Sequence, residues 1–277
     1  MLHWILWGLV LGFYSPVLIE LYRSRWEQVD YTHAYFILPL SLWFVWRMRA
    51  KLKELVKQNE ASLITTRPLA WSGYLFLIIL GVLMFSFGWR RDYLLITSLS
   101  LIPLLFGITG YVYGSRVAFA LRFPILFLLL MMPPPLGVLD SITIPLRYGI
   151  SIAVSKLLLL FKIPITRDGL ILSLGGHEVY MGPACSGFRS LITMITLGIT
   201  YTYIIKGSFA KKAILLGSVV PLALLGNFAR VAGVCLVTYY VSESAGQKFH
   251  DIAGYVIFVL LIFCLMGLDI LLDRRSK

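Results

Sequence analysis

Long apolar runs recur along this chain, and they constrain its fold more than any other feature of the sequence. They occupy residues 2–22, 34–48, 69–87, 93–113, 117–138, 142–161, 185–205, 213–240 and 252–272. A helix of about 20 apolar residues crosses the roughly 30 Å of hydrocarbon in a bilayer. The chain is 59% hydrophobic and only 14% charged, whereas about 25% of the residues in soluble domains are charged. The sequence therefore predicts an all-α polytopic membrane protein, with one transmembrane domain over residues 1–277.

The formal charge of +12 is best explained by orientation in the membrane, because lysine and arginine cluster in short loops. No basic face is left over for nucleic acid, so no nucleic-acid partner is expected. The first apolar run lacks a basic leader and a small-residue cleavage site, and we expect it to be retained as a span. The three cysteines have neither disulfide nor metal-site spacing, and no metal or cofactor is predicted.

The loop charges also predict a topology. The basic loop 47–67, the segment "KGSFAKK" (206–212) and the tail "DRRSK" (273–277) should be cytoplasmic. These assignments agree only if the run 142–161 does not cross the membrane. Its Arg147, Ser151 and Ser155 recur every four residues, which suits an amphipathic helix in the interface or packed half-way in, after a corner at prolines 133–135. We therefore expect about eight crossings and cytoplasmic termini.

This topology puts residues 162–184 on the outer face. Within them, "LILSLGGHEVYM" is typical of two short strands joined at Gly175-Gly176, a small outer-face β-hairpin. The hairpin would deliver the chain to Pro183 and Cys185 at the start of the next helix.

Cys185 is the first candidate for chemistry. Pro183 suits the first turn of a helix, so Cys185 should lie where the helix dipole favours a thiolate. Arg189, four residues later, should add a cation on the same helical face. The alternative is a packed, unreactive cysteine.

Arg230 lies within an apolar run, where a charge costs about 2.5–3.5 kcal/mol at the bilayer centre on insertion scales. It should therefore be paired, hydrated or functional, and we expect it in the outer half of its span. Asn227 lies three residues earlier on the same face, and Gly226 and Gly233 permit close helix contact. The alternative is a structural arginine that caps carbonyls or extends to the interface.

His250 opens the last span at the outer face, beside Asp251; the alternative is a solvated loop histidine. His33 and His177 are weaker candidates, and His177 is expected to be a solvated strand residue. A thiolate nucleophile needs an acid–base partner and a group that stabilises an oxyanion. Cys185, His250 and Arg230 could supply these three roles together at one membrane face.

The sequence resembles the exosortase/archaeosortase family of multi-pass membrane transpeptidases. The resemblance rests on "ACSGFRS" (184–190), "NFARV" (227–231) and "HDIAGY" (250–255), and extends to residues 31–47 and 122–164. It implies Cys185, Arg230 and His250 as catalytic residues, with Arg189 and Asn227 in support. His33-Ala34 stands where many members have His-Gly.

The resemblance also implies a substrate class and a place. The partners would be exported proteins whose C-terminal sorting tail has a short motif (Pro-Glu-Pro in the PEP-CTERM case), a transmembrane helix and a basic end. The enzyme would cleave near the motif at the outer face of the cytoplasmic membrane and transfer the new carboxyl end to an acceptor, in organisms that tend to make exopolysaccharide. A transporter and a non-catalytic factor for envelope polymer assembly remain the alternatives from other classes. No sequence pattern of a serine, aspartyl or zinc intramembrane protease is present.

Overall fold

The computed structural model describes residues 2–27, 31–61, 67–132 and 134–275. Residue 133 of the predicted 133–135 corner, residues 62–66 of the first basic loop and residues 276–277 of the basic tail lie outside these ranges. The chain divides into two compact units, Met1–Pro135 and Leu136–Lys277. In the described residues, six helices are long and apolar enough to cross a membrane, which confirms the predicted all-α polytopic class.

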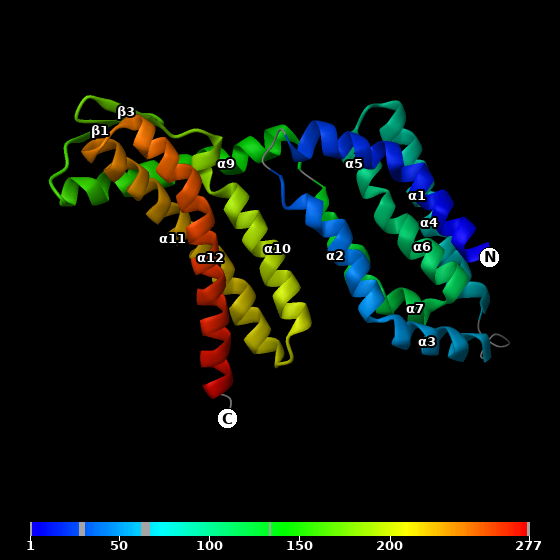
Figure 1. Ribbon diagram of the computed structural model, residues 1–277. Helices are drawn as coiled ribbons and strands as arrows, with labels where there is room; N and C mark the ends of the chain where they lie inside the picture. Colours follow the sequence, from blue (N-terminus) through cyan, green and yellow to red (C-terminus); the bar gives the residue numbers. More distant parts are fainter. Residues whose placement is uncertain (1, 28–30, 62–66, 133, 276–277) are drawn as a thin grey trace. The chain divides into compact units, whose positions relative to one another are not determined.

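The regular elements in the described part of the first unit are all helical (Figure 1). Its elements are α1 (Leu2–Leu21) with the π-helical turn η1 (Tyr22–Trp26), α2 (Ala34–Arg47), α3 (Arg49–Ala61), α4 (Arg67–Arg90), α5 (Leu94–Leu99), α6 (Leu101–Tyr113), α7 (Ser115–Ala120), α8 (Arg122–Phe127) and the 3₁₀ turn η2 (Leu128–Met131). Glycines let α4 and α6 approach closely: a Cβ at Gly81 would lie 2.9 Å from the Leu104 Cβ. Small residues at such contacts are the usual way in which apolar helices associate.

Two of the predicted spans in this unit differ from the structure. The run 34–48 forms a helix of 14 residues, shorter than a full crossing. The run 117–138 is not one helix but α7, α8 and η2 in succession. Pro124 has no N–H to continue the hydrogen bonding of α7 and is tolerated only in the first turn of a new helix, α8. The prediction of a single span there was wrong.

The second unit contains α9 (Leu136–Leu160), β1 (Ile165–Asp168), β2 (Ile171–Leu174), β3 (His177–Tyr180), the 3₁₀ turn η3 (Pro183–Ser186), α10 (Phe188–Ile204), α11 (Phe209–Tyr240) and α12 (Glu243–Arg275). The three strands form an antiparallel sheet in the order β1-β2-β3. The predicted hairpin is β2–β3, in which Leu174 pairs with His177 across the two glycines. Strand β1 was not predicted, because "ITRD" has only one buried apolar residue.

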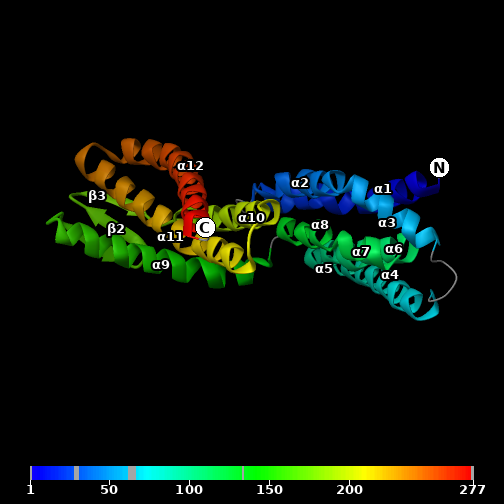
Figure 2. The same cartoon turned by 90° about the horizontal axis from the view of Figure 1, so that it is seen from below.

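The sheet packs on α9 and α11 at one end of the second unit (Figure 2). One buried cluster joins the three elements with the turn η3: Ile150, Val154, Leu158, Ile163, Ile165, Leu172, Leu174, Met181, Cys185, Val231, Ala232 and Cys235. Cys185 is therefore part of the apolar core that fixes the sheet to the helices.

Helix α9 lies crosswise to α10 within this unit (Figure 1). Its polar face is buried, since Arg147 is 7% exposed, Ser151 0% and Ser155 9%. The face that was expected to meet the interface or to pack half-way in is thus turned into the protein. By length and composition α9 is also one of the six helices able to span a membrane, so its interfacial placement stays a prediction.

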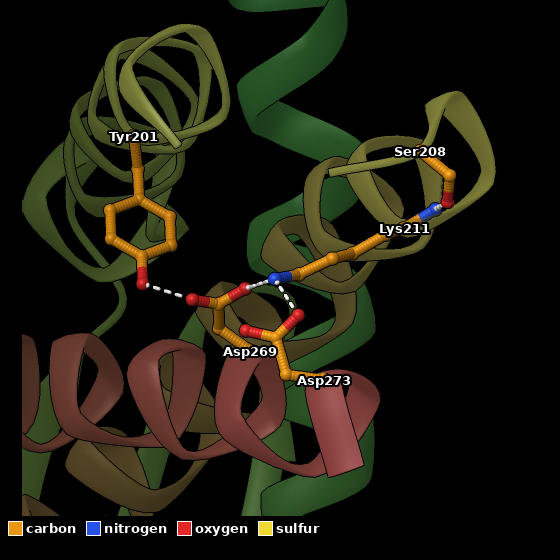
Figure 3. Close-up of polar contacts among 5 residues, drawn as sticks. All are labelled: Tyr201, Ser208, Lys211, Asp269 and Asp273. Atoms are coloured by element: carbon orange, nitrogen blue, oxygen red, sulfur yellow. Dashed lines mark hydrogen bonds and ion pairs between the residues drawn. The ribbon is translucent and has the colours of Figure 1, made fainter. Parts of the chain in front are cut away.

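A polar cluster joins α10, α11 and α12 at the other end of the unit (Figure 3). Lys211 Nζ lies 2.6 Å from Asp269 Oδ1 and 2.6 Å from Asp273 Oδ1. The Tyr201 hydroxyl donates to Asp269 Oδ2 at 2.7 Å, and the Ser208 hydroxyl oxygen accepts from the Lys211 N–H at the start of α11. These contacts fix the register of α11 against α12.

Candidate active site

The chain reaches Cys185 through a sharp change of backbone direction after strand β3. Gly182 is extended, with φ −67° and ψ 178°, and Pro183 opens the 3₁₀ turn η3 that contains Cys185. Gly187 follows in the left-handed region, with φ 71°, and α10 begins only at Phe188. The expectation that Cys185 lies in the first turn of the long helix was therefore wrong. Arg189 is separated from Cys185 by this break and does not follow it on one helical face.

A second contact fixes the position of Cys185 from α11. The Asn227 side-chain Nδ2 donates to the Cys185 carbonyl oxygen at 2.9 Å, and this hydrogen bond is buried. Gly187 packs directly on the same amide, because a Cβ there would lie 2.6 Å from Asn227 Cγ. Asn227, predicted in a supporting role, thus holds the turn that carries the thiol.

The thiol is buried but lies beside polar partners. Cys185 is 8% exposed, and this burial raises the pKa of its thiol above the ordinary value. The Arg230 guanidinium, the Gly182 backbone and Arg147 act in the opposite direction. A largely protonated thiol that needs a base to lose its proton is the expected resting form.

His250 brings a ring nitrogen close to the Cys185 sulfur. Its Nε2 lies 4.0 Å from the Cys185 sulfur, although the two residues are 65 positions apart in the chain. The Arg230 guanidinium contacts the same Nε2 from α11. The same Arg230 nitrogen lies 3.4 Å from Nδ1, and Nδ1 also lies 3.4 Å from the Asp251 carboxylate. Because arginine can only donate, the closer contact favours a lone pair on Nε2 and the ring proton on Nδ1. In this tautomer Nε2 can accept a proton from the thiol once Arg230 has moved away from that lone pair.

The structure brings together Cys185, Asn227, Arg230 and His250. Arg189 begins α10 beyond the Gly187 break and acts electrostatically on Arg230 and His250. The weaker candidate histidines lie elsewhere. His177 on β3 has its Nδ1 3.5 Å from Glu243, with a side chain that is 41% exposed. His33, the second weaker candidate, belongs to the first unit.

His33 directly precedes α2. It is buried, and its Nε2 lies 3.2 Å from the Leu130 carbonyl oxygen. Burial lowers the pKa of His33 to about 4, so the ring is neutral near neutral pH.

Arg147 is the residue that sequence reasoning did not include in the site. It lies on α9, is 7% exposed, and acts electrostatically on Cys185. The four-residue spacing of Arg147, Ser151 and Ser155 was noticed but interpreted as an interfacial face. The sequence did contain a signal for Arg147: it is an arginine at the start of a polar stripe whose members are separated by apolar residues.

Helix α11 runs from the polar cluster around Lys211 to the candidate site, so its length gives the distance between them. Lys211, in the polar cluster that joins α10, α11 and α12, and Arg230 are 19 positions apart on one helix (211 to 230). This corresponds to about 29 Å at 1.5 Å per residue. The hydrocarbon core of a bilayer is about 30 Å thick. The distance between the Lys211 cluster and Arg230 is therefore about the thickness of the hydrocarbon core.

Comparison with known proteins identifies the family of the chain. A scan against protein families matches residues 26–267, most of the chain, to the family described as transmembrane exosortase (Exosortase_EpsH). Neither the curated proteins nor the solved structures that were searched contain a match. The matched range includes the cysteine turn, Arg230 and His250 together with the helices that carry them. This protein is thus a member of the transmembrane exosortase family.

Proposed function

We propose that this protein is a membrane-embedded cysteine transpeptidase that cleaves the C-terminal sorting tail of exported proteins and transfers the new carboxyl end to an acceptor. The observation that carries the proposal is the approach of the Cys185 sulfur to His250 Nε2, at 4.0 Å, in a chain of the exosortase family. A thiol beside an unprotonated imidazole nitrogen is the minimum that nucleophilic catalysis by cysteine requires.

The first half of the reaction forms a thioester. The Cys185 thiol gives its proton to His250 Nε2, and the thiolate attacks the scissile carbonyl carbon. Arg230 then stabilises the negative oxygen of the tetrahedral intermediate, since its planar guanidinium offers several donors. When the intermediate collapses, the peptide C–N bond breaks and His250 returns the proton to the leaving amine.

The second half regenerates the enzyme. His250 removes a proton from the acceptor nucleophile, which attacks the thioester carbonyl. The C–S bond breaks, the new carboxyl end is bound to the acceptor, and the thiolate takes back the proton. With water in place of the acceptor, the same steps are proteolysis.

We place the reaction at the outer face of the cytoplasmic membrane, with both termini in the cytoplasm. The basic segment 206–212 includes Lys211, which belongs to the far polar cluster, and basic loops stay cytoplasmic. The site is about one hydrocarbon thickness away from that cluster along α11. The substrates would be proteins of the PEP-CTERM type, and the setting would be envelope and exopolysaccharide production.

Replacement of the thiol tests this function. Cys185→Ala should abolish maturation of a co-produced substrate that carries a sorting tail, while the variant protein still inserts in the membrane. Cys235→Ala is the matched control, since Cys235 lies in the same apolar cluster and should leave maturation unchanged. Normal maturation by Cys185→Ala would refute the nucleophile assignment. Mass analysis of the new C-terminus then separates transfer from hydrolysis.

The two alternatives give different results. A transporter should not form a saturable acyl adduct at Cys185 with a thiol-reactive substrate analogue. A non-catalytic assembly factor predicts that Cys185→Ala fully complements a deletion. Arg230→Lys provides a third comparison: a transpeptidase should be severely impaired, because one ammonium does not reproduce the planar donor fork.

A further inference from the structure

Arg147 is a buried cation without a described counter-ion. Its side chain is more than nine-tenths buried, and its Nε has no hydrogen-bond partner within the part of the chain that the structure describes. In the same described ranges, no carboxylate lies within ion-pair distance of it. Burial of an unpaired charge is costly, so a residue of this kind calls for an anion that the resting protein does not provide permanently.

The helix face that bears Arg147 points to the cysteine turn. Ile150, Val154 and Leu158 follow Arg147 at three, seven and eleven positions, so all four share one face of α9. The three apolar residues belong to the same buried cluster as Cys185, and α9 packs on the turn η3. Arg147 therefore lies one turn further along the face that covers the thiol.

The neighbouring hydroxyls do not compete for the guanidinium's role. Ser151 donates to the Tyr148 carbonyl at 2.9 Å, and Ser155 donates to the Ser151 carbonyl at 2.7 Å, both within α9. Their protons are used by their own helix. Of the three polar residues in this stripe, Arg147 is the one that remains available to act on Cys185.

The Arg230 guanidinium is the cation with the larger effect on Cys185, but it also contacts His250 Nε2 and is the group assigned to the oxyanion. We propose that Arg147 is a second cation of the active site, a positioning residue that favours the thiolate form of Cys185 and leaves Arg230 available for the oxyanion. This inference rests on the proposed function for its catalytic meaning, but its effect on the thiol is independent of any substrate.

The charged and titratable groups around Cys185 come from every helix packed on η3. Arg147 on α9 and Arg230 on α11 act on Cys185 directly, and His250 approaches it from α12. Arg189 on α10 and Asp251 on α12 act on Arg230 and His250. The two groups that act directly on Cys185 are permanent cations, so both favour a thiolate there. Removal of Arg147 should make this anion harder to form without touching the His250 contact.

The test measures the pH dependence of Cys185 alkylation by iodoacetamide in the full-length protein, in detergent micelles. The background carries Cys235→Ala and Cys264→Ala so that Cys185 alone reacts. Arg147→Met should shift the alkylation midpoint upward by roughly one pH unit, as expected when a nearby opposite charge is removed. Arg147→Lys, which keeps the charge, should shift it by much less.

Arg167→Met is the matched control, because it removes an exposed arginine of the same unit on β1 and should leave the midpoint unchanged. An Arg147→Met profile that coincides with the parent profile would overturn the inference. If that variant does not fold, Arg147→Gln is measured in its place with the same expectation. Failure of the proposed function would be visible separately, as normal maturation by Cys185→Ala.

Discussion

Gly187→Ala gives a sharp test of how the cysteine turn is held. Gly187 has φ 71°, a region in which an alanine costs about 1–2 kcal/mol. The new Cβ would also lie 2.6 Å from Asn227 Cγ and 2.7 Å from its Nδ2, so the amide must move. Movement of Asn227 breaks its hydrogen bond to the Cys185 carbonyl and leaves buried polar atoms without partners, for about 1–3 kcal/mol more.

Together these effects should destabilise the protein by about 2–5 kcal/mol. Catalysis should suffer as well, because a displacement of about 1 Å in a reacting group can cost about 100-fold in rate. The assay combines denaturant unfolding in detergent micelles with the rate of substrate maturation. Gly182→Ala is the control on the other side of the turn: its φ of −67° suits alanine, and the nearest atom to a Cβ is 3.5 Å away.

A double-mutant cycle identifies the cause. In an Asn227→Gly background the amide is absent, and so is the Asn227 Cβ, which would lie 2.8 Å from the new Cβ, so Gly187→Ala should cost only the backbone term of about 1–2 kcal/mol. If Gly187→Ala and Gly182→Ala had equal effects on stability and maturation, the proposed coupling of Gly187, Asn227 and Cys185 would be wrong.

Three further predictions follow from other parts of the structure. Asp269→Asn should lower the thermal unfolding midpoint more than Asp273→Asn, because the Asp269 side chain is 13% exposed and the Asp273 side chain 58%; equal shifts would contradict this. The pKa of His33 is about 4 when folded and about 6.5 when unfolded, so the unfolded chain binds the proton first. Stability should fall by up to about 3 kcal/mol as pH decreases from about 6.5 to about 4, and His33→Gln should remove that part of the pH dependence in thermal unfolding. Because burial raises the pKa of Cys185, its alkylation rate should still be rising at pH values where a free cysteine has levelled off.

The membrane class and the hairpin could be predicted because each depends on a local pattern. Twenty-residue apolar runs identified most of the long helices, and the Gly175-Gly176 pair identified the β2–β3 turn. The run 117–138 failed because hydropathy does not register where hydrogen bonding stops. Pro124 marks that point within an otherwise apolar stretch.

The proximity of three candidate side chains could be predicted, but the local geometry around them could not. Cys185, Arg230 and His250 were selected by chemistry and by the loop charges, and they do meet. The left-handed conformation of Gly187 is invisible in "ACSGFRS", where a glycine also fits the interior of a helix. Arg147 was overlooked because a polar stripe turned inward and one turned toward lipid headgroups have the same spacing.

The Lys211 cluster and Arg230, about 29 Å apart on α11, should make this protein sensitive to the thickness of the membrane around it. A thicker bilayer would draw either the Lys211 cluster or the His250–Arg230 pair into acyl chains unless the lipid thins around the protein, whereas a thinner bilayer would make the helices tilt. Turnover in reconstituted vesicles should accordingly pass through an optimum as lipid chain length increases. The lipid chain length would then determine how far the Cys185 thiol lies from the edge of the hydrocarbon.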